Sequence, residues 1–200
     1  MKILAFADTH GDMSALERIR EDVKKKDVDL VICAGDFTFF EQHIEIMIKK
    51  LSELGTDVLL IHGNHEYDEV VEVICKKYKN IYFMHNKMKR IGKYVFIGHG
   101  GGGFYLRDSE FVNEMDKISK KIEKNDEIIL LTHAPPFGTK IDAVPPYGHV
   151  GNKDYREFIE KNNIILAVSG HIHEGFGKED KIGKAKVISP GFKGKIVELE

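Results

Sequence analysis

Five short apolar runs in this chain are each followed, at once or within a few residues, by a small cluster of acidic, amide or imidazole side chains. The clusters are Asp8-Thr9-His10, Gly35-Asp36, Gly63-Asn64-His65-Glu66, Thr132-His133 and Gly170-His171-Ile172-His173. A short apolar run is typical of a buried strand, and open α/β sheets place their chemistry beyond the carboxyl ends of their strands. The pattern therefore predicts a strand-rich fold in which one polar site is assembled from five places in the chain.

Amphipathic segments separate the first strands. The periodicity predicts a helix over residues 12–25, with Leu16, Ile19 and Val23 on one face and a capping box formed by Ser14 and Glu17. Two further helices are expected, one between the strands at 30–33 and 58–61 and one around residues 70–78. This alternation is typical of βαβ units.

The pattern changes after residue 80. Short runs at 81–84, 88–91 and 94–98 follow one another without an intervening helix, so hairpin-connected strands are expected. A helix around residues 111–122 precedes a strand at 128–131, and a proline-rich loop spans 134–151. A short helix near 152–161 then leads to a strand at 164–168. The mixture predicts two sheets packed together, with helices outside.

Size and charge limit what the chain can be. Two hundred residues are enough for one good core, so a single domain over residues 1–200 is expected. Thirty Lys plus Arg against 32 Asp plus Glu leave a formal charge of -2, so no overall field attracts nucleic acid or an anionic membrane. The two cysteines form no CxxC pair, and no apolar stretch approaches the ~18 residues of a membrane span. We therefore expect a soluble cytoplasmic protein.

The clusters combine the side chains that bind divalent metal ions. Carboxylate, imidazole and amide oxygen together suit Mn, Fe, Co, Ni or Zn, and the lack of thiolate pairs argues against a purely structural zinc site. Two such ions roughly 3.5 to 4 Å apart need a bridging ligand, and a carboxylate has two oxygens for that purpose. Asp36 is the candidate bridge.

Most of the clusters also have a simpler explanation. Asp8 or His10 could cap the following helix, and Gly-Asp is an ordinary turn dipeptide. His171 and His173 could be solvent-exposed histidines. Gly-Asn-His-Glu is more specific, because a given tetrapeptide is expected in a random chain of this length only about once in a thousand cases. Much of the specificity of the pattern therefore comes from this one cluster.

In this order, the clusters resemble the calcineurin-like metallophosphoesterase superfamily, whose pattern runs D-x-H, G-D, G-N-H-[DE], H and G-H-x-H. The resemblance covers residues 8 to 173. It implies an α/β (α+β) fold, a four-layer αββα sandwich of two mixed β-sheets flanked by helices. It also implies two divalent metal ions, with Mn placed first and Fe, Ni, Co or Zn as alternatives. By that resemblance one ion would be held by Asp8, His10, Asp36 and His173, and the other by Asp36, Asn64, His133 and His171.

The same resemblance places His65 beside the phosphate of a substrate. A hydroxide bridging two dications would attack phosphorus in line with the leaving oxygen. His65, oriented by Glu66, could donate a proton to that oxygen and accelerate the reaction by about 10² to 10⁴ fold. His65 could instead only position Asn64.

Three further residues are candidates for contact with the substrate. They are His99 in a glycine-rich loop, Arg107 just beyond it and His149 in the proline-rich loop. The simpler explanations are a turn with unusual dihedral angles for the glycine-rich loop and a solvated surface charge for Arg107.

The leading hypothesis is a metal-dependent phosphoesterase that hydrolyses a small phosphomonoester or phosphodiester. A nuclease acting on DNA or RNA is the nearest alternative, although the near-neutral charge balance and the absence of Trp argue against it. The third hypothesis is a non-enzymatic metal-binding interaction scaffold of the same fold. The sequence leaves the substrate, the native metals and the oligomeric state open.

Overall fold

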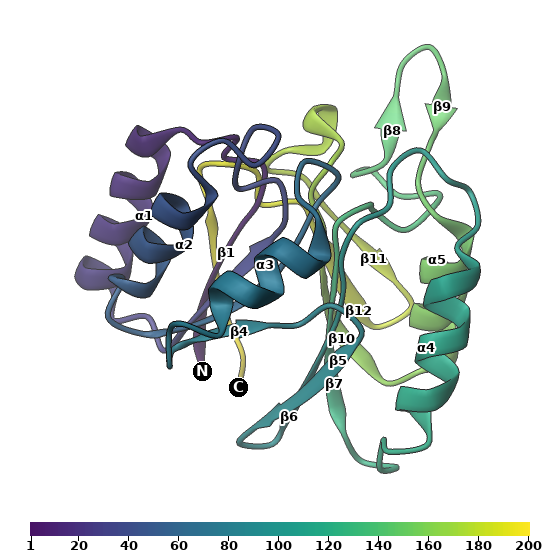
Figure 1. Ribbon diagram of the computed structural model, residues 1–200. Helices are drawn as coiled ribbons and strands as arrows, with labels where there is room; N and C mark the ends of the chain where they lie inside the picture. Colours follow the sequence, from purple (N-terminus) through teal and green to yellow (C-terminus); the bar gives the residue numbers. More distant parts are fainter.

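Two β-sheets packed face to face form the centre of the molecule, and helices cover both outer sides (Figure 1). The structure is a computed structural model that describes all 200 residues. The strand order is β13-β1-β2-β3-β4 in the first sheet and β11-β12-β10-β7-β6-β5 in the second. Both sheets are mixed, and the predicted four-layer αββα sandwich is confirmed.

The first sheet comes almost entirely from the N-terminal part of the chain. Its parallel strands are β1 (Lys2–Phe6), β2 (Leu30–Ala34), β3 (Asp57–Ile61) and β4 (Ile81–Phe83). The C-terminal strand β13 (Lys195–Glu198) pairs antiparallel with β1. The connecting helices, which cover the outer face, are α1 (Met13–Lys26), α2 (Ile44–Ser52) and α3 (Asp68–Cys75).

The second sheet is built from later strands. These are β5 (Lys87–Ile91), β6 (Tyr94–His99), β7 (Glu127–Thr132), β10 (Ile164–Val168), β11 (Glu179–Ile182) and β12 (Ala185–Ile188). Its outer face is covered by α4 (Ser109–Ser119) and α5 (Lys153–Lys161). None of the helices combines the length and apolar character that crossing a bilayer requires.

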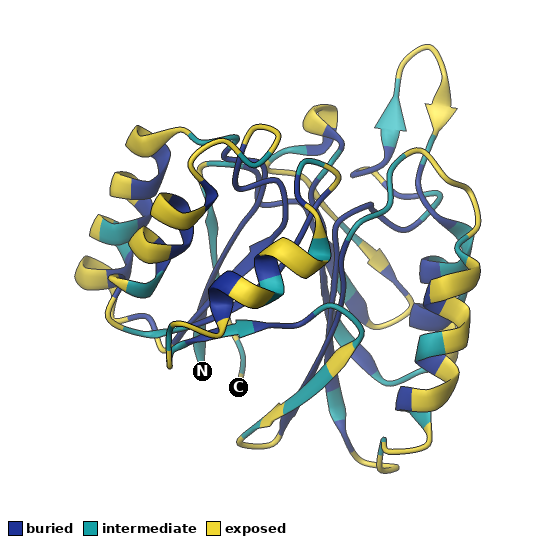
Figure 2. Ribbon diagram, viewed as in Figure 1, coloured by how far each residue is buried: buried dark blue, intermediate teal, exposed yellow.

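Alternate side chains of each central strand fill two different cores. In β1, Leu4 and Phe6 pack against the helices of the first sheet, whereas Ile3 and Ala5 face the second sheet. The central strands are buried on both faces (Figure 2), which is why they occur as continuous apolar runs in the sequence.

Two local expectations from the sequence are wrong. The cap of α1 is Asp12, whose carboxylate accepts hydrogen bonds from the backbone N–H groups of Ser14 (2.8 Å) and Ala15 (3.2 Å), so Ser14 lies inside the first turn and is not the cap. The strands β4 and β5 do not form a hairpin, because β4 pairs parallel with β3 and β5 pairs antiparallel with β6. The chain passes from the first sheet to the second between them.

The proline-rich segment is a loop, as expected, but it contains a small hairpin. Its strands are β8 (Ala143–Val144) and β9 (Gly148–His149). The hairpin projects beyond the same edge of the sandwich as the loops that carry the polar clusters (Figure 1).

Phe96→Ala tests the packing between the two sheets. Phe96 in β6 is fully buried in the core that the sheets share, and its removal should leave a cavity there. We expect the free energy of unfolding to fall by about 3–5 kcal/mol in chemical denaturation. Val112→Ala, on the exposed side of α4, should change it by less than about 0.5 kcal/mol. Equal stability of the two variants would show that the sheets are not tightly packed.

Candidate metal centre

The loops that carry the five clusters leave the two sheets at one edge. The parallel register sets Phe6 beside Cys33 and Ala34 beside Ile61, so β1, β2 and β3 end at nearly the same level. In the second sheet, β7 and β10 are parallel neighbours, and they end at residues 132 and 168. The carboxyl ends of five strands therefore bring the clusters together, as open α/β sheets do.

Three overlapping groups of potential metal ligands form at this edge, and within each group the ligand atoms lie within 4.8 Å of one another. The groups are Asp8, His10 and His173; His10, Asp36 and His65; and Asp36, His133 and His171. Asn64 adjoins the last group, because its Oδ1 lies 3.0 Å from His133 Nε2. All seven predicted ligands are thus close together, and their binding of metal stays a prediction.

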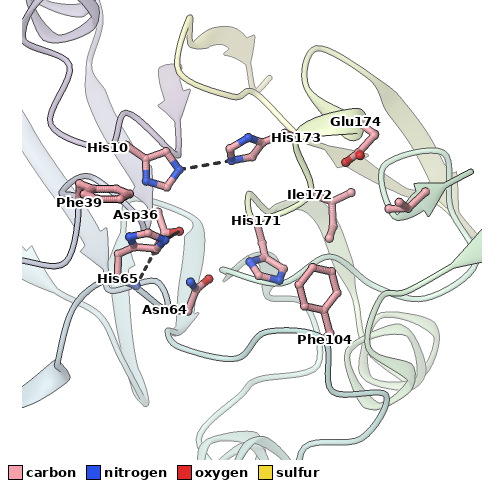
Figure 3. A pocket seen from close by; sticks show the side chains of 11 residues that line it. His10, Asp36, Phe39, Asn64, His65, Phe104, His171, Ile172, His173 and Glu174 are labelled. Carbon is pink, nitrogen blue, oxygen red and sulfur yellow. Dashed lines mark hydrogen bonds and ion pairs between the residues drawn. The ribbon is translucent and has the colours of Figure 1, made fainter. Parts of the chain in front are cut away.

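The imidazole rings of this site face one another with too few hydrogen-bond partners. The Nε2 atoms of His10 and His173 are 3.3 Å apart (Figure 3). Nδ1 of His10 and Nε2 of His171 are buried and have no partner. Buried polar atoms are normally satisfied, and a divalent cation is the kind of group that several imidazoles and carboxylates can satisfy together. The donor set therefore fits the implied ions.

A hydrogen bond to the backbone fixes the ring orientation of His133. Its Nδ1 lies 2.8 Å from the carbonyl oxygen of Ala34, which can only accept, so Nδ1 carries a hydrogen. Nε2 points to Asn64 and to Asp36, at 3.4 Å from Oδ2. Although burial lowers the pKa of His133, its interactions with Asp36 raise that pKa to about 9. A metal ion at Nε2 would therefore compete with a proton.

The two carboxylates of the site have very different proton affinities. Burial favours the protonated form of Asp36, but its interactions with His133 and the N–H of His65 outweigh this and lower its pKa to about 2. Burial raises the pKa of Asp8 to about 7, although His133 opposes this shift. Asp36 is thus a charged ligand at neutral pH, and a cation beside Asp8 would favour its charged form as well.

Four of the seven candidate ligands have a left-handed backbone. The φ angles are 57° for Asp8, 45° for His10, 49° for Asp36 and 66° for His171. Such conformations cost on the order of 1–3 kcal/mol each for residues other than glycine and are concentrated at functional sites. The loops therefore hold these side chains in place against a local backbone preference.

Glu66 does not orient His65, and that prediction is wrong. Its carboxylate accepts hydrogen bonds from the backbone N–H groups of Asp36 (3.1 Å), Gly63 (2.8 Å) and Thr38 (2.8 Å), and from the Thr38 hydroxyl (2.8 Å). The residue is 5% exposed. Glu66 therefore ties the loop after β2 to the loop after β3 and positions Asp36 through its backbone.

His65 lies at the mouth of the site in an orientation that suits proton donation. Its Nδ1 accepts a hydrogen bond from the backbone N–H of Phe40 (3.4 Å), so the neutral ring carries its hydrogen on Nε2. That atom lies 3.8 Å from Oδ2 of Asp36. The ring edge that can donate is thus turned toward the metal ligands.

A cavity of about 590 Å³ opens over the centre. It is lined by His10, Asp36, Phe39, Asn64, His65, Phe104, Val144, His171, Ile172, His173 and Glu174 (Figure 3). Asp8 and His133 lie beneath this surface, at 3% and 0% exposure. Phe39 and Phe104 were not among the predicted site residues, because no sequence pattern distinguishes an exposed aromatic residue in a loop from one in the core.

Of the four residues predicted to contact substrate, only His65 lines this cavity. The other three lie outside it, and each is held by an acidic side chain. The pairs are His99 with Asp108 (3.1 Å), Arg107 with Glu157 (2.7 Å) and His149 with Asp142 (2.9 Å). The structure therefore places these three side chains outside the cavity, and their contact with a substrate stays a prediction.

Asp36→Asn tests the shared ligand. An amide has one oxygen and no charge, so it cannot replace a carboxylate that faces two ligand groups. We expect the stoichiometry of Mn²⁺ binding, measured by calorimetry, to fall from about two ions per chain to about one or fewer. Asp116→Asn, on the exposed side of α4, should bind as the unaltered protein does. Full binding by Asp36→Asn would show that Asp36 is not the shared ligand.

Known proteins have sequences similar to that of this chain. The family described as calcineurin-like phosphoesterase matches residues 1–175. An uncharacterised protein of Methanocaldococcus jannaschii is 33% identical, over 98% of this chain and 91% of its own. An uncharacterised metallophosphoesterase of Helicobacter pylori is 26% identical over 88% of this chain, and the match spans 45% of that protein's length.

Solved structures have the same fold. The protein TT1561 of Thermus thermophilus aligns with a TM-score of 0.79 over 96% of this chain and 90% of its own, at 17% sequence identity. At that identity, the likeness shows the fold alone. The family match extends over most of the chain and includes all five clusters. This chain therefore belongs to the calcineurin-like phosphoesterases, metal-binding hydrolases of phosphoester bonds.

Proposed function

We propose that this protein is a dinuclear metal-dependent phosphoesterase that hydrolyses a small phosphomonoester or phosphodiester. The observation that carries the proposal is that Asp36 belongs to two groups of metal ligands on the floor of an open cavity. Two cations that share a carboxylate beneath a substrate cavity are the arrangement that phosphoester hydrolysis uses. Mn is our first choice of metal, and Fe, Ni, Co and Zn suit the same donors.

The division of the ligands between the two ions follows the family resemblance. Asp8, His10 and His173 would hold one ion, Asn64, His133 and His171 the other, and Asp36, which shares one ligand group with His10 and another with His133 and His171, would hold both. When bound, the two dications would lower the pKa of a water molecule and neutralise the charge of the phosphoryl oxygens.

The protein holds these ligands through hydrogen bonds outside the metal-binding atoms. Glu66 fixes the backbone of Asp36, and the carbonyl of Ala34 fixes the ring of His133. The backbone N–H of His171 donates to Asp8 (3.0 Å). These contacts set the direction of each ligand before an ion arrives.

His65 would supply the proton for the leaving group. When the bond between phosphorus and the leaving oxygen breaks, negative charge develops on that oxygen, and a nearby imidazole that donates a proton lowers the barrier. When protonated, His65 can donate from Nε2, the ring nitrogen that lies 3.8 Å from Oδ2 of Asp36 on the cavity floor. It is the titratable side chain on the cavity wall whose orientation suits this role.

The cavity lining supports a small substrate rather than a nucleic acid. None of its eleven residues is Lys or Arg, whereas proteins that bind a polynucleotide usually line the site with a basic track. A nuclease therefore remains the less supported alternative.

Removal and return of metal test the activity. The protein should hydrolyse 4-nitrophenyl phosphate or bis(4-nitrophenyl) phosphate, lose that activity after chelation and dialysis, and regain it with Mn²⁺, as followed by nitrophenolate absorbance. A folded protein that binds these ions and hydrolyses neither ester with Mn, Fe, Co, Ni or Zn would contradict the proposal and favour the interaction scaffold.

His65→Ala tests proton donation. We expect kcat for phenyl phosphate to fall by about 10² fold or more, because phenolate leaves poorly without a proton. The loss with 4-nitrophenyl phosphate should be much smaller, because nitrophenolate is a better leaving group. Mn²⁺ content should not change. Equal losses with both esters would instead indicate that His65 only positions Asn64.

A further inference from the structure

The cavity over the candidate metal centre has an exposed aromatic ring on each of two sides. Phe39 is 48% exposed, and its ring centre lies 5.3 Å from that of His65 and 6.4 Å from that of His10. Phe104 is 70% exposed and lies 4.7 Å from His171. In Figure 3 the two phenyl rings lie on opposite sides of the facing histidines. Exposed apolar groups gathered at a cavity are typical of a surface that binds an apolar ligand.

The charges of the cavity lining disfavour a substrate that carries a second anionic group. Apart from the histidines, the charged residues of the lining are Asp36 and Glu174, both acidic. A second phosphate or a carboxylate on the substrate would find no Lys or Arg to pair with, and Glu174 would repel it. The lining therefore favours a substrate that carries no negative charge outside the reacting phosphate.

The two rings stand beside different ligand groups of the candidate centre. Phe39 lies beside His10, which forms a group with Asp8 and His173, and Phe104 lies beside His171, which forms a group with Asp36 and His133. A phosphate bound between these two groups would have one ring on each side for its substituents. A monoester has one organic substituent and would leave one ring uncovered, whereas a diester has two.

The side of Phe39 offers additional apolar space. A second cavity of about 310 Å³ shares Phe39 and His10 with the first, and it is also lined by Met13, Ile46 and Met47. Phe40, which is 64% exposed, packs on His65 with 4.3 Å between ring centres. The substituent on this side would therefore lie next to the proposed proton donor and on an apolar wall.

Resting on the function proposed above, we infer that the preferred substrate is a phosphodiester with an apolar or aromatic group on each ester oxygen. The leaving group lies on Phe39, and the retained group lies on Phe104. The oxygen of water forms a new bond to phosphorus, and the bond to the leaving oxygen breaks. That oxygen keeps the electron pair and takes a proton from the imidazolium form of His65, which then regains a proton from solvent, while the proton of the attacking water passes to solvent. The products are an alcohol or phenol and a phosphomonoester that carries the retained group.

Two diesters with the same leaving group and different retained groups test whether Phe104 contacts the retained group. Bis(4-nitrophenyl) phosphate and methyl 4-nitrophenyl phosphate have equal charge and differ only in the retained group. With Mn²⁺-loaded protein, Phe104→Ala should lower kcat/KM for the bis-aryl ester by about ten-fold and change it for the methyl ester by less than about two-fold. For each ester, Phe104→Ala is compared with the unaltered protein, so the different intrinsic reactivities of the two esters cancel. Because Phe104 is mostly exposed, the variant should fold normally.

Two further variants complete the experiment. Phe39→Ala should lower kcat/KM for both diesters, because their leaving groups are identical. Tyr147→Ala removes an aromatic ring that is 81% exposed and outside the cavity lining, so it should change neither value by more than about two-fold. If Phe104→Ala affects both diesters equally or neither, the inferred substrate class is wrong while the phosphoesterase proposal stands. If neither diester nor any monoester is hydrolysed, both proposals fail.

Discussion

Polar contacts between carboxylates of the first sheet and groups of the second hold the candidate centre together. Asp8 follows β1 and accepts from the backbone N–H of His171, which follows β10. Asp36 follows β2 and faces His133, which follows β7. The sandwich core brings the ends of the strands near one another, but these contacts set the relative positions of the two halves of the site. The proposed chemistry therefore depends on the two sheets keeping their positions relative to each other.

The glycines of the motifs permit this close approach. A Cβ atom at Gly63 would overlap the carboxylate of Asp36, and one at Gly170 would overlap that of Asp8. A larger residue at either position would push a carboxylate away from the neighbouring loop. The glycine before Asn64 and the one before His171 are thus part of the centre, although neither has a side chain that could bind an ion.

The sequence was enough to predict the sandwich and to name the residues that the structure gathers at one edge. This was possible because strands buried on both faces are continuous apolar runs, and because each potential ligand directly follows such a run. The sequence did not show that the chain changes sheets between β4 and β5, since pairing partners are set by the whole core. The role of Glu66 was hidden for a related reason, since its partners include Asp36 and Thr38, about 30 residues earlier in the chain. His99 ends β6 and Arg107 lies in the loop after it, but contacts with Asp108 and Glu157 hold their side chains outside the cavity over the centre.

Several features of the centre are unfavourable unless positive charge is present. Asp8 is a buried carboxyl group whose pKa is raised to about 7, ring nitrogens of His10 and His171 lack partners, and four candidate ligands have left-handed backbones. In the unfolded chain these groups are hydrated and unstrained, so the cost arises on folding. Ions that bind only the folded state would offset it, by about 4 kcal/mol at a free concentration a thousand times the Kd. Because the same ions would bind and activate the substrate, the geometry that is unfavourable without positive charge is the geometry that prepares the centre for catalysis.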